Sequence, residues 1–250
     1  MKKKSLATFL LILISWQISS LAFSQIYLPG PLKVFETFLQ MVLDGSLFVN
    51  IGASLFRVFS GFFLALIFSF LLAFLFFYKK SLRAYFSGLL SFLKNIPPLG
   101  LIPLLIIWLG IGETSKIAMV FMACFFPLFF NIEKGFLNVD PDLVEMAQVF
   151  SYKDGEIFKN IILPASLKDI FTGARIALGY AFRSIIAAEM LAASTGLGYL
   201  LNFSRLMSRT DKVMVALIVI GLIGLISDWL FVKISKRFLK GDLKNDLSKN

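Results

Sequence analysis

Histidine is absent from the sequence, and cysteine occurs once, as Cys124 within an apolar run. Histidine is the commonest general base and metal ligand in proteins, so its absence removes the usual means of both kinds of chemistry. A single cysteine excludes a disulfide framework and a thiolate metal site. Charged residues are also scarce, because they make up 16% of the chain, against about 25% in an ordinary soluble domain.

Apolar residues are abundant instead. Hydrophobic residues make up 58% of the 250 residues, and 29 of them are phenylalanine. A soluble domain of this size cannot hide so much apolar surface, since even a 300-residue domain buries only about 75% of its area. The composition therefore excludes a cytosolic globular enzyme, and we expect an all-α membrane protein with several spans.

Long apolar runs give the number of spans. A membrane-crossing helix needs about 20 mostly apolar residues, because each residue rises about 1.5 Å across a hydrocarbon core of about 30 Å. We predict about six transmembrane helices on this basis. They cover residues 6–23, 58–78, 96–112, 117–132, 170–191 and 213–232.

The third and fourth runs are short and contain proline, and we expect both spans to be broken. Their prolines are Pro97, Pro98, Pro103 and Pro127. Proline removes a backbone donor and kinks a helix, which a membrane tolerates where protein or a water-filled cavity satisfies the freed groups. Such spans indicate a transport route, although a packing kink is an equally good interpretation.

The basic residues indicate the orientation. With the N-terminus inside, the cytoplasmic stretches are 1–5, 79–95, 133–169 and 233–250. These stretches carry 17 Lys and Arg residues, and the outer stretches carry 6. An excess of positive charge on the cytoplasmic side is the rule for membrane proteins, so both termini should be cytoplasmic. The net charge of +10 then reflects topology, and we expect no nucleic-acid partner.

Residues 1–24 allow two interpretations. Three lysines, an apolar stretch and a tail of small residues describe an uncleaved first span, but they also describe a secretory signal peptide. Cleavage would leave five spans, with the rest of the chain oriented as before.

The fifth run carries small residues at helical spacing, which lets helix backbones approach closely inside a bundle or at a subunit contact. These residues are Gly173, Ala177, Ala181, Ser184 and Ala188.

Two charged residues in the same run, Arg183 and Glu189, are candidates for a role in a solute pathway or its gating. A charge within the bilayer costs about 2.5–3.5 kcal/mol, so each should face water or a partner. Alternatively, Arg183 is satisfied by carbonyl groups, or by Asp228 or Glu36 from another segment.

The stretch 133–169 is long for a connector, and its sequence predicts a two-helix hairpin. Asp140 is a typical N-cap with Pro141 at the first helical position, and Ser151 is a candidate N-cap for the second helix. We expect the second helix to end before Pro164. Its apolar face would comprise Ile157, Phe158, Ile161 and Ile162. Such a hairpin suits docking onto another protein, although a solvated structural hairpin is the alternative.

These residues also resemble a known family. Glu145-Met146-Ala147, followed seventeen residues after the glutamate by Ile162-Leu163-Pro164, resembles the EAA loop of ABC-importer membrane subunits. The segments 28–38, 96–120 and 173–201 are similar to permeases of the nitrate, sulfonate and taurine type.

The resemblance implies a type I ABC-importer permease fold, a single permease domain over 1–250 with its core helices in 50–232, and a coupling loop at 133–169. The implied ATPase-coupling residues are Glu145, Met146, Ala147, Ser151, Gly155, Ile162, Leu163 and Pro164. Two positions depart from the family pattern, because Ser151 stands where glycine is usual and Lys168 where proline is frequent. A glycine at the first position would supply a turn with positive φ, which costs serine of order 1 kcal/mol unless the turn is rebuilt.

The chain has no phosphate-binding loop, since the segment 110–116 has no glycine before its lysine. We therefore expect no catalytic residue, metal or cofactor in this chain, with ATP and magnesium bound by a separate ATPase. The resemblance implies a second permease copy, two cytoplasmic ATPase subunits and an extracytoplasmic solute-binding protein at the inner membrane.

The solute implied by the resemblance is a small anion such as nitrate, a sulfonate or taurine. A pyrimidine thiamine precursor is the alternative within this importer class. A carrier driven by an ion gradient and a membrane scaffold without a pathway are the alternatives of other classes.

Overall fold

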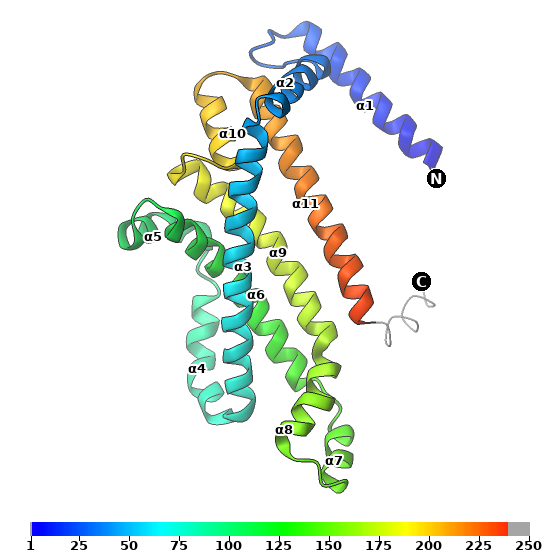
Figure 1. Cartoon of the computed structure of the whole chain (residues 1–250), viewed down its shortest axis with the longest axis vertical. Helices are drawn as coiled ribbons and strands as arrows, with labels where there is room; N and C mark the ends of the chain where they lie inside the picture. The colour runs from blue at the N-terminus through cyan, green and yellow to red at the C-terminus, as the bar shows by residue number, and fades with distance from the viewer. Residues whose placement is uncertain (1, 240–250) are drawn as a thin grey trace. The chain divides into compact units, whose positions relative to one another are not determined.

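The computed structural model describes residues 2–239, which form helices and contain no β-strand (Figure 1). The helices are α1 (Lys2–Ala22), α2 (Pro31–Leu43), α3 (Ser46–Tyr78), α4 (Lys80–Leu93), α5 (Ile102–Leu109), α6 (Glu113–Leu137), α7 (Pro141–Val149), α8 (Asp154–Ile157), α9 (Leu163–Ala192), α10 (Leu197–Leu206) and α11 (Thr210–Phe238). A 3-10 turn at Pro98–Leu101 precedes α5, and a π-helical turn at Phe158–Ile162 joins α8 to α9. The expected all-α class is confirmed.

The described residues divide into two compact units. The first unit contains residues 2–56 and 186–223, and the second contains residues 57–185 and 224–239.

The first unit has an apolar core between α2, the start of α3, α10 and the start of α11. Its buried residues are Val34, Met41, Leu47, Leu197, Leu200, Val215, Ala216 and Val219. One polar pair is buried beside it, where the Thr37 hydroxyl donates to the Asp211 carboxylate at 2.9 Å. Because buried polar groups are costly without a partner, this bond fixes α2 against the start of α11.

In the second unit, α6 packs closely against α3 and α9 through glycine. A Cβ atom at Gly173 would lie 2.5 Å from Cβ of Asn131, and one at Gly61 would lie 2.6 Å from Cβ of Val120. Ala177 and Ala181 are fully buried, and the Cys124 thiol donates to the Ala177 carbonyl at 3.3 Å. The first part of the stripe of small residues on α9 is therefore buried inside the bundle, where Gly173 and Ala177 contact α6.

Three helices, α3, α6 and α11, are each long and apolar enough to cross a bilayer. Among the described residues the number of spans rises to five if each of two bent helix pairs counts as one span. The apolar part of α1, Leu10–Ala22, is shorter than a span and is not counted. The sequence predicted about six spans, and the difference lies in α1 and in how the bent pairs are counted.

Proline has opposite effects in the two spans that we expected to be broken. In the run at 96–112 the chain bends at the first prolines, where α4 meets the segment Pro98–Leu109 at 83°, and that segment then continues across Pro103. The expectation for the run at 117–132 is wrong, because α6 continues from Glu113 to Leu137 with Pro127 inside it. A membrane helix tolerates a single proline where neighbouring groups satisfy the freed backbone.

The stretch 79–95 was expected to be a connector, and most of it forms α4 instead. Its polar residues recur on one face and its apolar residues on the other, so a simple hydropathy average conceals the helix. In the second unit α4 returns beside the end of α3 (Figure 1), where the rings of Phe76 and Phe86 lie 6.2 Å apart.

The contact between α6 and α9 predicts unequal effects of two equivalent substitutions in α9. Gly173→Ala should destabilise the protein by about 1–3 kcal/mol, because the added methyl group overpacks the contact with Asn131. Gly179→Ala is the matched control, since a Cβ atom there meets nothing within 4 Å. Thermal unfolding in detergent measures both variants, and equal melting temperatures would contradict this account of the packing.

Candidate functional site

The hairpin begins as predicted. The carboxylate of Asp140 accepts the N–H of Asp142 at 3.0 Å, which caps α7, and Pro141 is the first residue of that helix. Glu145 and Met146 are exposed on α7, and Ala147 is buried. The three residues of the EAA-like motif therefore belong to a capped helix, on which two of the three side chains are exposed.

Ser151 does not cap the second helix, so that prediction is wrong. Its φ is +61°, its N–H donates to Gln148 O, and the N–H of Tyr152 donates to Ala147 O. This is a Schellman motif, in which the residue after the helix adopts the left-handed region that favours glycine. Ser151 thus ends α7 in the conformation for which a glycine is best suited, and the turn is not rebuilt.

The second helix starts three residues later. α8 begins at Asp154, and the Glu156 carboxylate accepts the N–H of Lys153 at 2.8 Å. Gly155 is exposed and has open space around its Cα.

The expected helix end before Pro164 is also wrong, since α8 continues through the π-helical turn into α9. In this turn the N–H of Leu163 donates to Phe158 O, five residues back. Proline has no N–H for the preceding turn, and its ring needs room there. The wider turn accommodates Pro164, and it makes α8 and α9 one continuous helical rod, to which α7 is joined by the turn at Ser151.

Within the second unit, an aromatic cluster attaches the hairpin to α3 and α6. Phe158 is buried, and its ring lies 4.8 Å from Phe74, 5.2 Å from Phe136 and 5.7 Å from Phe77. The Tyr78 hydroxyl donates to Asp154 O at 3.5 Å. Aromatic contacts of this kind contribute about 0.5–1.5 kcal/mol each beyond the area they bury. The start of the rod is therefore held by the ends of α3 and α6.

The far side of the hairpin is apolar and uncovered. Val149 is 82% exposed and Phe150 is 72% exposed. Together with three neighbours they form a surface that we call the apolar tip. It comprises Leu143, Met146, Val149, Phe150 and Tyr152. An exposed apolar patch on a helical hairpin is typical of a protein-binding surface.

Arg183 is exposed on the face of α9 that points away from α6. A groove of about 570 Å³ runs along this face. Its lining residues are Thr172, Arg175, Ile176, Gly179, Tyr180, Arg183 and Asp228. Asp228 binds Arg175 in a two-point pair, with N–O distances of 2.6 and 2.8 Å, and Arg183 has no ion pair among residues 2–239.

A second cavity, of about 350 Å³, lies on the other side of Tyr180. Three of the four prolines that indicated a transport route, Pro97, Pro98 and Pro127, line this cavity together with Lys94. The groove therefore lies on the outward face of α9 and the cavity lies between α6 and α9, and Tyr180 lines both.

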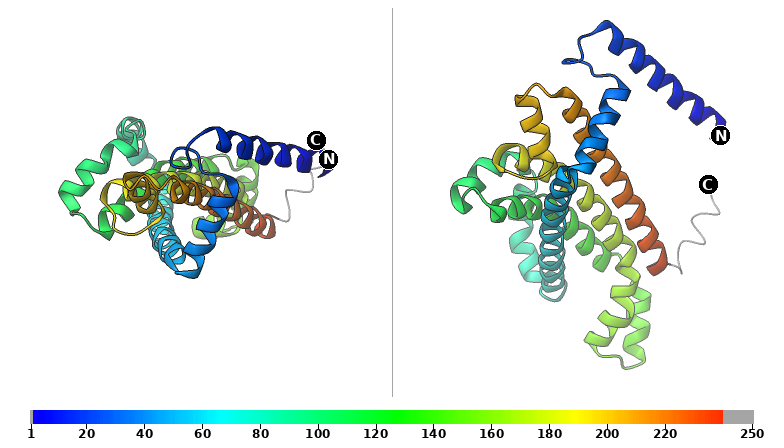
Figure 2. Two further views of the ribbon diagram at one scale, coloured as in Figure 1. Left: turned by 90° about the horizontal axis from the view of Figure 1, so that it is seen from above. Right: turned by 45° about the horizontal axis from the view of Figure 1, so that its top comes forward.

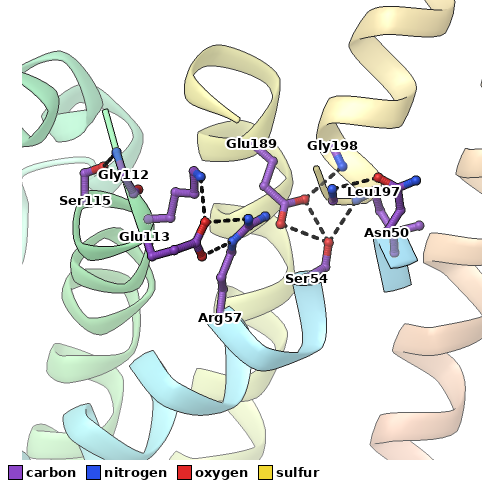
Figure 3. A network of polar contacts seen from close by, with 11 residues as sticks. Asn50, Ser54, Arg57, Gly112, Glu113, Ser115, Glu189, Leu197 and Gly198 are labelled. Carbon is purple, nitrogen blue, oxygen red and sulfur yellow. Dashed lines mark hydrogen bonds and ion pairs between the residues drawn. The ribbon is translucent and has the colours of Figure 1, made fainter. Parts of the chain in front are cut away.

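Glu189 is fully enclosed in the first unit, with 1% of its surface exposed. Figure 3 shows its carboxylate between Ser54 and the start of α10, where it accepts the Ser54 hydroxyl at 2.8 Å and the N–H of Gly198 at 2.9 Å. Ser54 accepts the N–H of Leu197, and Asn50 accepts the N–H of Gly196. These side chains satisfy the first N–H groups of α10, which a membrane would otherwise leave unpaired.

The network requires glycine at two positions in and after the break between α9 and α10. Gly196 has φ +121°, and a Cβ atom there would collide with the Glu189 carboxyl, while one at Gly198 would collide with Ile186 O. The sequence indicated Glu189 by its charge, but Asn50 and Ser54 have no signal of their own, because short polar residues in a helix are usually unremarkable.

A further polar network in the second unit joins α3 to the start of α6. The guanidinium of Arg57 binds the Glu113 carboxylate at 2.6 and 2.7 Å, and the Lys116 ammonium binds it at 3.0 Å (Figure 3). Arg57 and Lys116 are buried. The segment 110–116, already excluded as a phosphate loop, is thus the start of a helix fixed by ion pairs. Among residues 2–239 no three His, Cys, Asp or Glu side chains lie where they could hold a metal ion.

A family described as the binding-protein-dependent transport system inner membrane component matches residues 34–240. The chain belongs to this permease family. Membership makes it an inner-membrane transport subunit that works with a binding protein, and not an enzyme.

Named relatives agree with this identification. The permease is 32% identical over 213 residues to the aliphatic sulfonates transport permease protein SsuC of Bacillus subtilis, with 85% of this chain and 77% of that protein covered. It is 31% identical over 220 residues to the taurine transport system permease protein TauC of Escherichia coli, with 86% and 80% covered. The resemblance drawn from the motifs is confirmed.

The fold of the permease is similar to that of a solved chain of the MetNI methionine ABC transporter in an inward-facing conformation. The TM-score is 0.67 at 15% sequence identity, and the match covers 77% of this chain and 95% of that one. The expected type I ABC-importer permease fold is confirmed.

The Schellman motif of the permease predicts that Ser151→Gly stabilises the hairpin by up to about 1 kcal/mol, because glycine adopts positive φ without steric cost. The protection of the Tyr152 amide, measured by hydrogen exchange, should rise by about fivefold. Ser87→Gly, on the exposed helix α4, is the control and should lower stability by about 0.5 kcal/mol. Unchanged or faster exchange at Tyr152 would contradict the strain assigned to Ser151.

Proposed function

We propose that this permease and a second copy of it form the membrane pathway of an ATP-driven importer for a sulfonate-type anion. The observation that carries the proposal is the continuous rod from α8 into α9, to which α7 with its apolar tip is joined by the turn at Ser151. A rigid connection of this kind transmits a displacement at the hairpin directly to a membrane-spanning helix. The whole chain acts as one permease domain, with its core helices in 50–232.

The apolar tip docks into a cytoplasmic ATPase, and each of two ATPase subunits binds ATP and magnesium. Met146 supplies exposed apolar area, and Glu145 supplies a charge at its edge. Ala147, Ile162 and Leu163 hold the shape of the hairpin, since Ala147 and Ile162 are buried. Ser151, Gly155 and Pro164 set its turn, the start of its second helix and its junction with α9.

In this arrangement both termini and the hairpin are cytoplasmic. The excess of Lys and Arg in the stretches assigned to the cytoplasm supports that orientation. The break between α9 and α10 then lies toward the outer side, where a binding protein delivers the solute.

The outward face of α9 lines the route. Arg183 and Arg175 place positive charge in the groove, and Asp228 compensates only Arg175. Exposed cations favour an anionic solute over a neutral heterocycle. They also disfavour the passage of cations through the same groove. Glu189 contributes to gating by holding the start of α10, since it bonds Ser54 and Gly198 across the break.

ATP drives the cycle because it binds the closed ATPase pair more tightly than the open pair. A ligand shifts a conformational equilibrium only by its difference in affinity for the two states. Closure of two ATPases would draw the two hairpins together, and each rod would tilt its α9 between an inward-open and an outward-open arrangement.

Docking through the apolar tip predicts that Val149→Glu abolishes co-purification of the ATPase subunit and ATP-dependent uptake. The reason is that a carboxylate at an 82% exposed apolar position must be desolvated when the interface forms. Asn160→Glu is the matched control, because Asn160 is exposed outside the apolar tip. Both variants should unfold at the temperature of the natural protein. Full ATPase recovery with Val149→Glu would exclude the tip as the docking surface.

A role of Arg183 in the route predicts that Arg183→Ala lowers uptake of a sulfonate by at least about tenfold, since a hydrogen bond to a charged group contributes about 1.5–3 kcal/mol. Arg183→Lys retains the charge and should retain part of the uptake. ATPase co-purification should be normal in both. Uptake at the natural rate by purified Arg183→Ala transporter in vesicles would remove Arg183 from the route.

A further inference from the structure

The cavity beside Tyr180 combines a cation with an aromatic wall. Lys94 and Asn95 lie at its polar edge, and Phe126, Phe130 and Tyr180 line it from α6 and α9. All of these residues belong to the second unit. The volume of about 350 Å³ is in the range of a small organic molecule.

The charge of Lys94 is held in place without being neutralised. Its ammonium lies 5.1 Å from the centre of the Phe130 ring, a cation–π contact that positions the charge at the edge of the cavity. Within residues 2–239 no carboxylate pairs with it. An exposed ammonium that touches only an aromatic ring retains donors for an anion.

The backbone beside Lys94 offers few donors of its own. Pro97 and Pro98 have no N–H group, and the Asn95 amide, just after α4, donates to Ser91 O at 2.7 Å in the last turn of that helix. An anion in the cavity would therefore depend on Lys94, with the second amide hydrogen of Asn95 as the remaining donor.

A polar stripe on α4 leads to the cavity. Residues spaced by three or four positions along this helix and just beyond its end are small or polar and exposed: Lys80, Ala84, Ser87, Ser91 and, after the helix, Asn95. The opposite face carries exposed Tyr85, Leu89 and Phe92. Because the stretch 79–95 is assigned to the cytoplasmic side, this exposed stripe faces water there and gives the cavity an aqueous approach.

We propose that this cavity is a binding subsite for an organic anion that has a charged head and a short apolar tail. The head binds Lys94 and Asn95, and the tail lies between Phe126, Phe130 and Tyr180. The aromatic wall gives no advantage to an inorganic anion such as nitrate, because nitrate has no apolar surface to bury. The inference rests on the proposed function and adds a site and a chemical requirement to it.

Cysteine accessibility tests the subsite directly, because the natural Cys124 is fully buried. Asn95→Cys places a thiol at the edge of the cavity in the complete transporter, and a maleimide then measures its accessibility. Butanesulfonate should slow this labelling, methanesulfonate should slow it less, and nitrate at the same ionic strength should leave it unchanged. Ser81→Cys, an exposed position on α4 outside the cavity, is the matched control and should be labelled at one rate throughout.

The charge is tested in the same assay. Lys94→Gln should raise the butanesulfonate concentration for half protection by about tenfold, and Lys94→Arg should raise it less, because it keeps the charge. Lys80→Gln, on the same stripe but outside the cavity, should change nothing.

Equal protection of the two thiols, protection by nitrate equal to that by butanesulfonate, or unchanged protection after Lys94→Gln would overturn the subsite. Recovery of the ATPase with the permease and ATP-dependent uptake by the natural complex are measured separately. If uptake is normal and protection is absent, the subsite fails and the proposed function stands. If protection is present and no ATPase is recovered, the importer proposal fails and the subsite stands.

Discussion

The close contact between α6 and α9 is the constraint on which the rest of the structure depends. Between membrane helices there is no hydrophobic gain to drive association, so contact relies on dense packing of small residues. Gly173 lets the backbone of α9 approach Asn131, and the alanines beyond it continue the same seam. Because the second helix of the hairpin continues into α9 without interruption, a force on that helix acts on a helix that is already locked to its neighbour.

Polar backbone groups impose the second constraint. Every break in a membrane helix exposes N–H and C=O groups that need partners, since lipid offers none. The break between α9 and α10 is made by capping its first N–H groups with side chains of Asn50, Ser54 and Glu189. Pro164 meets the same requirement by another means, as the π-helical turn provides room for its ring and keeps the rod continuous. Fixed breaks and continuous junctions together decide which parts of a permease can move.

Ion pairing distinguishes the cations that stabilise the structure from the cations that are available to a solute. Arg57 binds Glu113 and Arg175 binds Asp228, so these pairs hold helices together, and Lys116 binds Glu113 within α6. Arg183 and Lys94 lie in hollows on either side of Tyr180. A permease for an organic anion needs cations of the second kind beside apolar surface, because it must recognise a charge without holding it permanently.

The sequence by itself determined the class, the membrane environment and the hairpin, because apolar run length, capping residues and the EAA-like spacing are local properties. The family pattern marked position 151 as one where glycine is usual, but the sequence predicted Ser151 to be an N-cap. Only the tertiary structure decided that Ser151 ends α7, that α6 passes through Pro127 unbroken, and that α4 is a helix. It alone brought Asn50 and Ser54 to Glu189 and placed Lys94 over Phe130. Those outcomes depend on which distant groups satisfy a freed backbone or a buried charge, and sequence spacing contains no record of that pairing.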